Sequence, residues 1–230
     1  MKKTTRSKSS PASAKIKILI VDDHPLVRDW LGRLIGQESD LIACGEAADR
    51  AGAIASLDAR KPDMVVTDLS LGNGALGIEL IKDIRARTPS MPVLVLSMHD
   101  ESIYAERALH AGATGYVSKQ AAPAAILDAI RKVARGEICL SGPMAAKVLK
   151  KFATGAATHA EGDIEQLSDR ELEVFELLGH GKSSQEIGDQ LHISIKTVET
   201  YKTRLKEKLG LGNARELLQY AVQWLLVHGS

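Results

Sequence analysis

The sequence predicts an α/β domain with a doubly wound, five-stranded parallel sheet, followed by a small all-α domain. Short apolar runs alternate with amphipathic segments as far as about residue 136, which is typical of strands and helices that alternate along the chain. The apolar runs are continuous rather than broken at every second residue, as expected for strands that are covered on both faces. After Gln166 only helical periodicity continues.

The predicted elements follow from this alternation. Strands are expected at 16–21, 41–46, 64–67, 93–97 and 115–117. Helices are expected between and after them, near 25–37, 49–60, 77–87, 101–111 and 123–135. Five strands alternating with five helices give a doubly wound sheet.

The rest of the chain is predicted to be helical. The segment 142–151 has helical spacing, whereas 152–162 is rich in Ala, Gly and Thr and is typical of a linker. Three pairs at capping-box spacing predict where later helices begin: Ser168 with Glu171, Ser183 with Glu186, and Asn213 with Glu216. Ser194 and Gly210 fit the start and the end of a further helix, which lies between the helices that begin at Ser183 and Asn213. We therefore expect a disordered basic tail over 1–14, an α/β domain over 15–136, a linker with a candidate helix over 137–164, and an all-α domain over 165–230.

Composition excludes several classes of protein. The formal net charge is +1, so a DNA-binding function must rest on where the charges lie. The two cysteines, Cys44 and Cys139, form no disulfide framework and lack metal-ligand spacing. The apolar run 18–21 is far too short for a signal peptide or a membrane span. We expect a cytoplasmic protein with no membrane partner.

Acidic residues follow two of the predicted strands. Asp22 and Asp23 come after the first strand, and Asp68 comes after the third. Since the carboxyl ends of parallel strands meet at one edge, these side chains are expected to converge. Three converging carboxylates repel one another unless a cation neutralises them, and oxygen ligands suit Mg²⁺. Ser97 ends the fourth strand and Lys119 follows the fifth, so the edge is suited to a phosphoryl group on a carboxylate.

The motifs at these strand ends resemble the receiver domain of two-component systems, which has a flavodoxin-like fold. The matching motifs are Val21-Asp22-Asp23-His24-Pro25, Asp68-Leu69, Ser97-Met98-His99-Asp100, and Gly112-Ala113 through Lys119. The resemblance implies a sensor histidine kinase as partner, Asp68 as the phosphoacceptor, and Ser97, Lys119 and Tyr116 as phosphate-stabilising and switch residues. It also implies a Mg²⁺ site formed by Asp22 through water, Asp23, Asp68 and the backbone carbonyl of Ser70. One departure concerns Gly72, where receivers usually have proline; it leaves the shape of this loop and the lifetime of the phosphoryl group open.

The all-α part contains a candidate DNA-binding helix. A short helix over about 184–191 and a tight turn precede a second helix over about 195–209. Between 196 and 208 there are five basic and two acidic residues, so positive charge is concentrated there. Two helices joined in this way place the second one in the major groove of DNA.

Three motifs resemble the LuxR-type helix-turn-helix domain of the NarL/FixJ class of response regulators. They are Leu167-Ser168-Asp169-Arg170-Glu171, Gly181 through Ile187, and Ser194-Ile195-Lys196-Thr197-Val198-Glu199-Thr200. The resemblance implies that Glu199, Thr200 and Thr203 reach base edges and that Tyr201 makes an aromatic contact. Phosphate contacts are implied for Lys182, Lys196, Thr197, Lys202 and Arg204. An acid at Glu199 costs affinity near phosphates but can accept a hydrogen bond from a cytosine amino group.

Together the two resemblances imply a transcription regulator controlled by phosphorylation and not an enzyme, apart from its own phosphoryl transfer. Phosphorylation of Asp68 is expected to shift a closed form, with the reading helix covered by the receiver, towards an open form that dimerises on double-stranded DNA. The main alternative is DNA binding that does not depend on phosphorylation, for which the Gly72 loop is the sequence hint. A ligand-binding regulator is disfavoured because the acidic strand ends and the small number of Phe (two) and Tyr (four) argue against an aromatic-lined pocket. A phosphohydrolase is disfavoured because Ser70 stands where such enzymes need a second acid.

Overall fold

The computed structural model of the chain describes residues 14–71, 75–154, 164 and 166–228. The predicted disordered tail and the Gly72 loop therefore lie almost entirely outside the described residues. Within them no helix is long and apolar enough to cross a bilayer.

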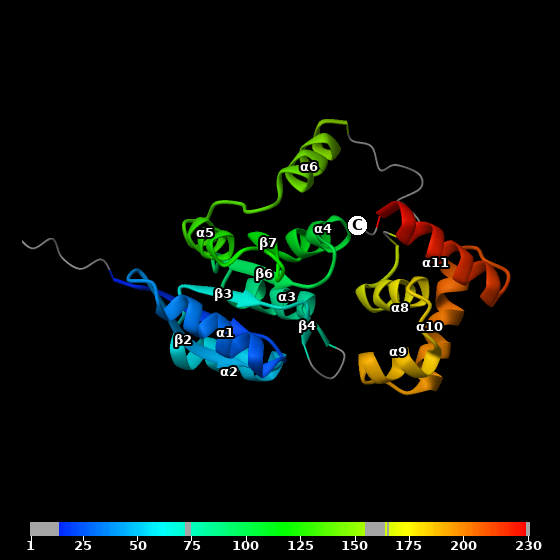
Figure 1. Cartoon of the computed structure of the whole chain (residues 1–230), viewed down its shortest axis with the longest axis horizontal. Helices are drawn as coiled ribbons and strands as arrows, with labels where there is room; N and C mark the ends of the chain where they lie inside the picture. The colour runs from blue at the N-terminus through cyan, green and yellow to red at the C-terminus, as the bar shows by residue number, and fades with distance from the viewer. Residues whose placement is uncertain (1–13, 72–74, 155–163, 165, 229–230) are drawn as a thin grey trace, which may run out of the picture.

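All five predicted strands form one parallel sheet (Figure 1). Its strands are β1 (Ile16–Val21), β2 (Leu41–Ala47), β3 (Met64–Thr67), β6 (Val93–Ser97) and β7 (Gly115–Ser118). Their order is β2-β1-β3-β6-β7, and every pairing is parallel. The order reverses direction at β1, so the carboxyl ends of β1 and β3 lie side by side at the position where such sheets bind ligands.

The five predicted helices cover both faces of this sheet. They are α1 (Pro25–Gly36), α2 (Arg50–Arg60), α3 (Gly77–Arg87), α4 (Glu101–Ala111) and α5 (Pro123–Ala134). Alternate residues of β1 enter different cores: Ile18 and Ile20 pack with α1 and α5, whereas Leu19 and Val21 face the other side. Both sets are buried, which is why the strand reads as a continuous apolar run.

A short antiparallel pair, β4 (Ser70–Leu71) and β5 (Ala75–Leu76), was not predicted. Two-residue strands are too short to give a periodic pattern. The pair returns the chain to Gly77, whose backbone NH donates to the carbonyl of Leu69 at 2.6 Å. A Cβ atom at Gly77 would lie 2.1 Å from the carbonyl oxygen of Asp68, so no side chain fits there. Glycine at this position allows the start of α3 to pack directly against the backbone of Asp68.

The remainder of the described chain is helical, as predicted. The helices are α6 (Gly142–Thr154), α8 (Asp169–Gly179), α9 (Ser184–Leu191), α10 (Ile195–Lys208) and α11 (Ala214–His228). Helix α6 continues to Thr154, three residues into the predicted linker. We call α8–α11 the helical unit, and the sheet with α1–α5 the α/β unit. The core of the helical unit includes Phe175, Val198, Leu205 and Trp224.

The predicted helix starts are confirmed, with one change. Full capping boxes begin α8 and α9, and the Ser194 side chain caps α10. At α11 the Asn213 side chain accepts from the backbone NH of Glu216, but the Glu216 carboxylate accepts from the backbone NH of Gly212 instead of that of Asn213. The bond from the backbone to the Glu216 carboxylate therefore starts one residue earlier than in a standard capping box.

The Gly77→Ala variant should be destabilised by about 1–3 kcal/mol, because its new methyl group overlaps the backbone of Asp68. Gly36→Ala, at the end of α1, is the matched control, since a Cβ there meets no atom of the described part of the chain within 4 Å. We expect this control to be neutral or more stable by up to about 1 kcal/mol. Urea unfolding followed by circular dichroism measures both. Equal stability of the two variants would contradict the proposed close packing at Gly77.

Candidate functional site

The three predicted aspartates come together at the carboxyl edge of the sheet. Asp22 follows β1 and Asp68 follows β3, and both are buried. The backbone NH of Asp68 donates to the carbonyl of Val21 at 2.9 Å, so the two strand ends are fixed to each other. One ligand atom from each of Asp22, Asp23, His24 and Asp68 lies within 4.8 Å of the others.

The side chain of Lys119 links two of these acids. Its Nζ atom lies 2.6 Å from Oδ2 of Asp22 and 2.7 Å from Oδ2 of Asp68, and the side chain is only 9% exposed. Burial by itself would lower the pKa of Lys119, but Asp68 and Asp22 outweigh it and raise this pKa. Burial raises the pKa of Asp22, although the bond from Lys119 opposes the rise. The ammonium therefore stays charged and offsets part of the repulsion between the carboxylates.

One carboxylate oxygen in this group is left without a hydrogen bond. Oδ1 of Asp23 is buried and has no hydrogen-bond partner among the described residues. Nδ1 of His24 approaches it at 2.7 Å but not in hydrogen-bonding geometry. A buried carboxylate oxygen in this situation is costly unless a cation meets it. The oxygen donors of Asp22, Asp23 and Asp68 fit a hard divalent ion such as Mg²⁺.

The two predicted serines share a neighbour, His99. Ser97 is fully buried at the end of β6, and its Oγ accepts from the backbone NH of His99 at 3.3 Å. Oγ of Ser70 lies 2.9 Å from Nε2 of His99. His99 was predicted only as part of the motif over 97–100, and its ring connects the loop after β6 with the loop after β3.

Tyr116 points into the α/β unit from β7. Its side chain is 1% exposed, and its hydroxyl donates to the carbonyl of His99 at 2.9 Å. Burial is the main cause that raises the pKa of Tyr116 above its usual range, so the hydroxyl remains a donor. The predicted switch residue thus contacts the same loop as Ser97.

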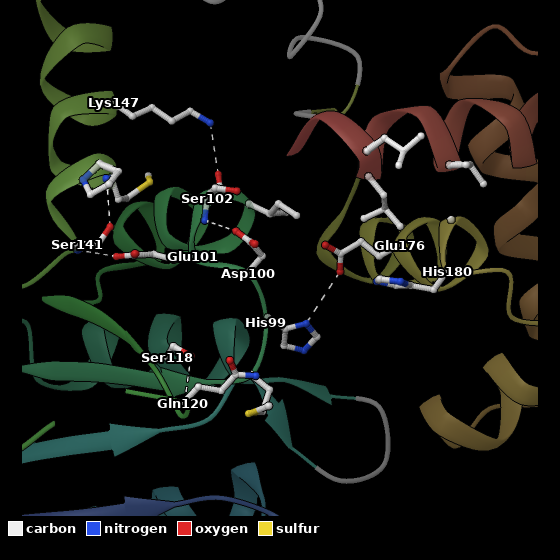
Figure 2. A pocket seen from close by; sticks show the side chains of 18 residues that line it. His99, Asp100, Glu101, Ser102, Ser118, Gln120, Ser141, Lys147, Glu176 and His180 are labelled. Carbon is white, nitrogen blue, oxygen red and sulfur yellow. Dashed lines mark hydrogen bonds and ion pairs between the residues drawn. The ribbon is translucent and has the colours of Figure 1, made fainter. Parts of the chain in front are cut away.

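The α/β unit contacts the helical unit through α4 and α8, which sequence reasoning missed. The hydroxyl of Tyr104 donates to Oε2 of Glu176 at 2.7 Å, and Tyr104 is fully buried. Nδ1 of His99 lies 4.0 Å from the same carboxylate oxygen. Figure 2 shows His99 and Glu176 pointing toward each other from the two units.

Arg107, one turn after Tyr104 on α4, adds a second set of bonds. Its guanidinium donates to the carbonyls of Ile164 and Leu167 at 2.9 and 2.8 Å and to Oδ1 of Asp169 at 2.9 Å. These acceptors lie just before or at the start of α8. Arg107 therefore holds the chain where it enters the helical unit.

Burial changes the protonation of Glu176. It raises the pKa of this carboxyl to about 7, although the Tyr104 hydroxyl, which favours the charged form, opposes the rise. Glu173 and Asp100 raise it further, whereas Arg107 lowers it. Near neutral pH the contact between the units therefore includes a carboxyl group that is partly protonated.

Two cavities lie along the boundary between the units. One of about 430 Å³ is lined by Asp23, Ser70 and His99 from the α/β unit and by Arg170 and Glu173 from α8. The other, of about 930 Å³, lies among the loop after β6, α4, α6, α8 and α11 (Figure 2). The acidic edge of the sheet therefore opens toward the helical unit.

The predicted DNA-contacting residues lie in α10, apart from Lys182 just before α9. Exposed side chains are those of Lys182, Lys196, Glu199, Thr200, Thr203 and Arg204. Half-buried side chains are those of Thr197, Tyr201 and Lys202. The guanidinium of Arg204 lies 6.0 Å from the centre of the Tyr201 ring. The sequence predicted a closed form in which the α/β unit covers this helix, but in this structure the outer face of α10 is exposed and the contact falls on α8.

Comparisons with known proteins identify both parts of the chain. The receiver domain of response regulators matches residues 18–131, and the LuxR family of bacterial regulatory proteins matches residues 165–221. The transcriptional regulatory protein YxjL of Bacillus subtilis is 33% identical over 210 residues, which cover 91% of this chain and 96% of that protein. The oxygen regulatory protein NreC of Staphylococcus carnosus is 33% identical over 211 residues, which cover 90% of this chain and 97% of that protein.

Solved structures give the same result. RcsB from Salmonella enterica serovar Typhimurium, bound to the promoter rprA in the presence of the phosphomimetic BeF3-, is 30% identical with a TM-score of 0.58. That comparison covers 90% of this chain and 98% of RcsB. A LuxR-family response regulator from Aurantimonas is 35% identical with a TM-score of 0.56, over 61% of this chain and 99% of that protein. The chain therefore belongs to the two-component response regulators that join a receiver to a LuxR-type helix-turn-helix, and it is a DNA-binding regulator of transcription.

Proposed function

We propose that phosphorylation of Asp68 controls DNA binding by this regulator. The observation that carries the proposal is the position of Lys119, whose ammonium lies between Asp22 and Asp68 at a buried sheet edge. In the proposed division of the chain, the receiver spans 15–136, the linker 137–164 and the DNA-binding domain 165–230. The proposed phosphodonor is a sensor histidine kinase or a small phosphorylated molecule. The proposed compartment is the cytoplasm, where the regulator has access to DNA.

The proposed phosphoryl transfer uses a carboxylate oxygen of Asp68 as the nucleophile. That oxygen forms a bond to phosphorus while the bond from phosphorus to the donor nitrogen or oxygen breaks, and the leaving group keeps the electron pair. Asp22, Asp23, Asp68 and the backbone carbonyl of Ser70 would hold Mg²⁺, with Asp22 acting through water. When bound, the ion neutralises charge on the transferring group. Lys119 pairs with the phosphate afterwards, since its ammonium already lies 2.7 Å from Asp68.

The change of charge reaches α8 through the loop after β6. A phosphoryl group brings a charge of about −1.5 to −2 and new acceptor oxygens to Asp68. The Ser97 hydroxyl turns to donate to one of them and no longer accepts from His99. Tyr116 and Ser70 also form hydrogen bonds with His99. A shift of this loop therefore moves the His99 ring, whose Nδ1 atom faces Glu176. We propose that the contact between α4 and α8 then breaks, and that the released protein forms a homodimer on DNA.

The helical unit supplies the proposed DNA contacts. A helix-turn-helix places the exposed side of its second helix in the major groove, which here is α10. We propose that Glu199, Thr200 and Thr203 face base edges and that Tyr201 makes an aromatic contact. The proposed phosphate contacts are those of Lys182, Lys196, Thr197 and Arg204, together with Lys202 as the sequence implied. A dimer would read two half-sites about one helical turn apart.

One observation favours the alternative, DNA binding without phosphorylation. The outer face of α10 is exposed although α8 is packed against the α/β unit. A receiver that does not cover α10 leaves a single reading helix accessible, so a monomer could bind DNA in this arrangement. In this alternative Asp68→Asn binds DNA as well as the unchanged protein does, with or without phosphodonor.

Phosphate-affinity electrophoresis with acetyl phosphate should show a retarded band for the unchanged protein in the presence of Mg²⁺. The band should disappear with a chelator, which removes Mg²⁺. It should also disappear in Asp68→Asn, which lacks the nucleophile. Asp58→Asn, an exposed acid on α2, is the control and should keep the band. A retarded Asp68→Asn band would show that another residue accepts the phosphoryl group.

The Tyr104→Phe variant should favour separation of the two units. Losing the hydroxyl leaves a buried carboxylate without its donor, which costs about 1–3 kcal/mol. The radius of gyration in small-angle X-ray scattering should therefore increase, and Arg107→Ala should increase it in the same direction. Arg87→Ala, an exposed arginine at the end of α3, is the control. An unchanged radius in both Tyr104→Phe and Arg107→Ala would contradict the contact.

The separation of the units should also depend on pH through Glu176. Its pKa is about 7 when packed and returns to near 4.5 in water, so the packed form binds more protons between these values. Raising the pH from 6 to 8 removes that proton and weakens the packing, whereas below about 4.5 the dependence vanishes. The radius of gyration should thus rise from pH 6 to 8. Glu176→Gln, which has no titrating group, should lose most of this rise; if it keeps the full rise, another group is responsible.

A further inference from the structure

The outer face of α10 includes an acid that two neighbours hold in place. Oε1 of Glu199 accepts from the hydroxyl of Ser184 at 2.6 Å and from Nζ of Lys202 at 2.9 Å. Nζ of Lys202 also lies 3.2 Å from Oγ of Ser184. Ser184 begins α9, so this triad joins the two helices of the helix-turn-helix through side chains.

The triad leaves one oxygen of Glu199 available. The side chain is 53% exposed, and no hydrogen bond or ion pair is found for Oε2 among the described residues. The bonds from Ser184 and Lys202 lower the pKa of the carboxyl, which keeps it ionised. Glu199 therefore presents a fixed, charged acceptor on the exposed side of the reading helix.

The two threonines beside it offer no free hydroxyl proton. Oγ1 of Thr200 donates to the carbonyl of Lys196 at 2.9 Å, and Oγ1 of Thr203 donates to the carbonyl of Glu199 at 3.0 Å. Their methyl groups and oxygen lone pairs remain for a partner. At these three positions α10 thus presents acceptors and methyl groups, so a matching base must supply the donor.

We infer that Ser184 and Lys202 position Glu199 to select a cytosine in each half-site of the operator. The cytosine amino group is a donor in the major groove, and Glu commonly accepts from it. Adenine also offers an amino group, but its N7 acceptor lies beside that group and repels a carboxylate. Guanine and thymine present acceptors at the corresponding edge.

This inference changes the role expected for Lys202. Its side chain is 20% exposed and is bonded to Ser184 and Glu199, so it acts as a positioning residue instead of a phosphate contact. Its charge also reduces the repulsion between the Glu199 carboxylate and the phosphates that flank the groove. The inference rests on the proposed function, since it concerns the base preference of the same DNA-binding surface.

The test is selection of binding sites from a random duplex pool by the full chain, phosphorylated with acetyl phosphate and Mg²⁺. The unchanged protein should enrich sites with one cytosine position per half-site, which it prefers by about 5- to 150-fold over other bases, the range expected for one mismatched base pair. Glu199→Gln should lose this preference or shift it to adenine, because an amide pairs with both the amino group and N7 of adenine. Glu207→Gln, an exposed acid later on α10, is the matched control and should select the same sites as the unchanged protein.

Two further variants test the positioning residues. Ser184→Ala and Lys202→Met should weaken the preference at the cytosine position while leaving the other positions of the site unchanged. Ser184→Thr, which keeps the hydroxyl, should restore it. A purely structural role for Ser184 would instead lower affinity equally for all sequences.

The outcomes separate the two proposals. Identical selected sites for Glu199→Gln and the unchanged protein would overturn this inference and leave the proposed function standing. An undiminished cytosine preference in both Ser184→Ala and Lys202→Met would overturn the positioning roles. No enrichment of any sequence by the unchanged protein would overturn the proposed function and this inference with it.

Discussion

The ammonium of Lys119 holds two buried aspartates together at the carboxyl edge of the sheet. Asp22 and Asp68 are 3% and 4% exposed, and without a cation their charges would force the ends of β1 and β3 apart or require protonation. Lys119 alone cannot balance three carboxylates, and no described residue forms a hydrogen bond with Oδ1 of Asp23. The charges at this edge are therefore only partly balanced. Added positive charge, or a redistribution of negative charge, would change how the strand ends pack.

That sensitivity matters because the edge and the helical unit share one loop. His99 contacts Ser70 and Ser97, accepts from Tyr116 through its carbonyl, and faces Glu176 across the boundary. Few groups separate the proposed phosphorylation site from α8, and Ser70, Ser97, His99 and Tyr116 are all partly or fully buried. Because buried groups are closely packed, a small displacement near Asp68 is transmitted to the residues that face α8.

The sequence predicted most of the fold and the acidic site but not the contact between the units. Continuous apolar runs identify the strands, and in a parallel sheet the ends of β1 and β3 must meet, which is sufficient to group Asp22, Asp23 and Asp68. The pairing of Tyr104 with Glu176 joins residues 72 positions apart on different units, and no periodicity encodes how two units pack. In sequence, Glu176 resembles any acid on the polar face of a helix. The bonds of Lys202 were also missed, because they depend on side-chain conformation.

The contact between α4 and α8 lies within a single chain, and this has a consequence for assembly. Its strength does not vary with protein concentration, whereas dimer formation does. Under the proposed cycle both partners must first be released, so the apparent dimer dissociation constant scales with the inverse square of the released fraction. Bonds such as those of Arg107 would thus set the cellular abundance at which the regulator begins to pair.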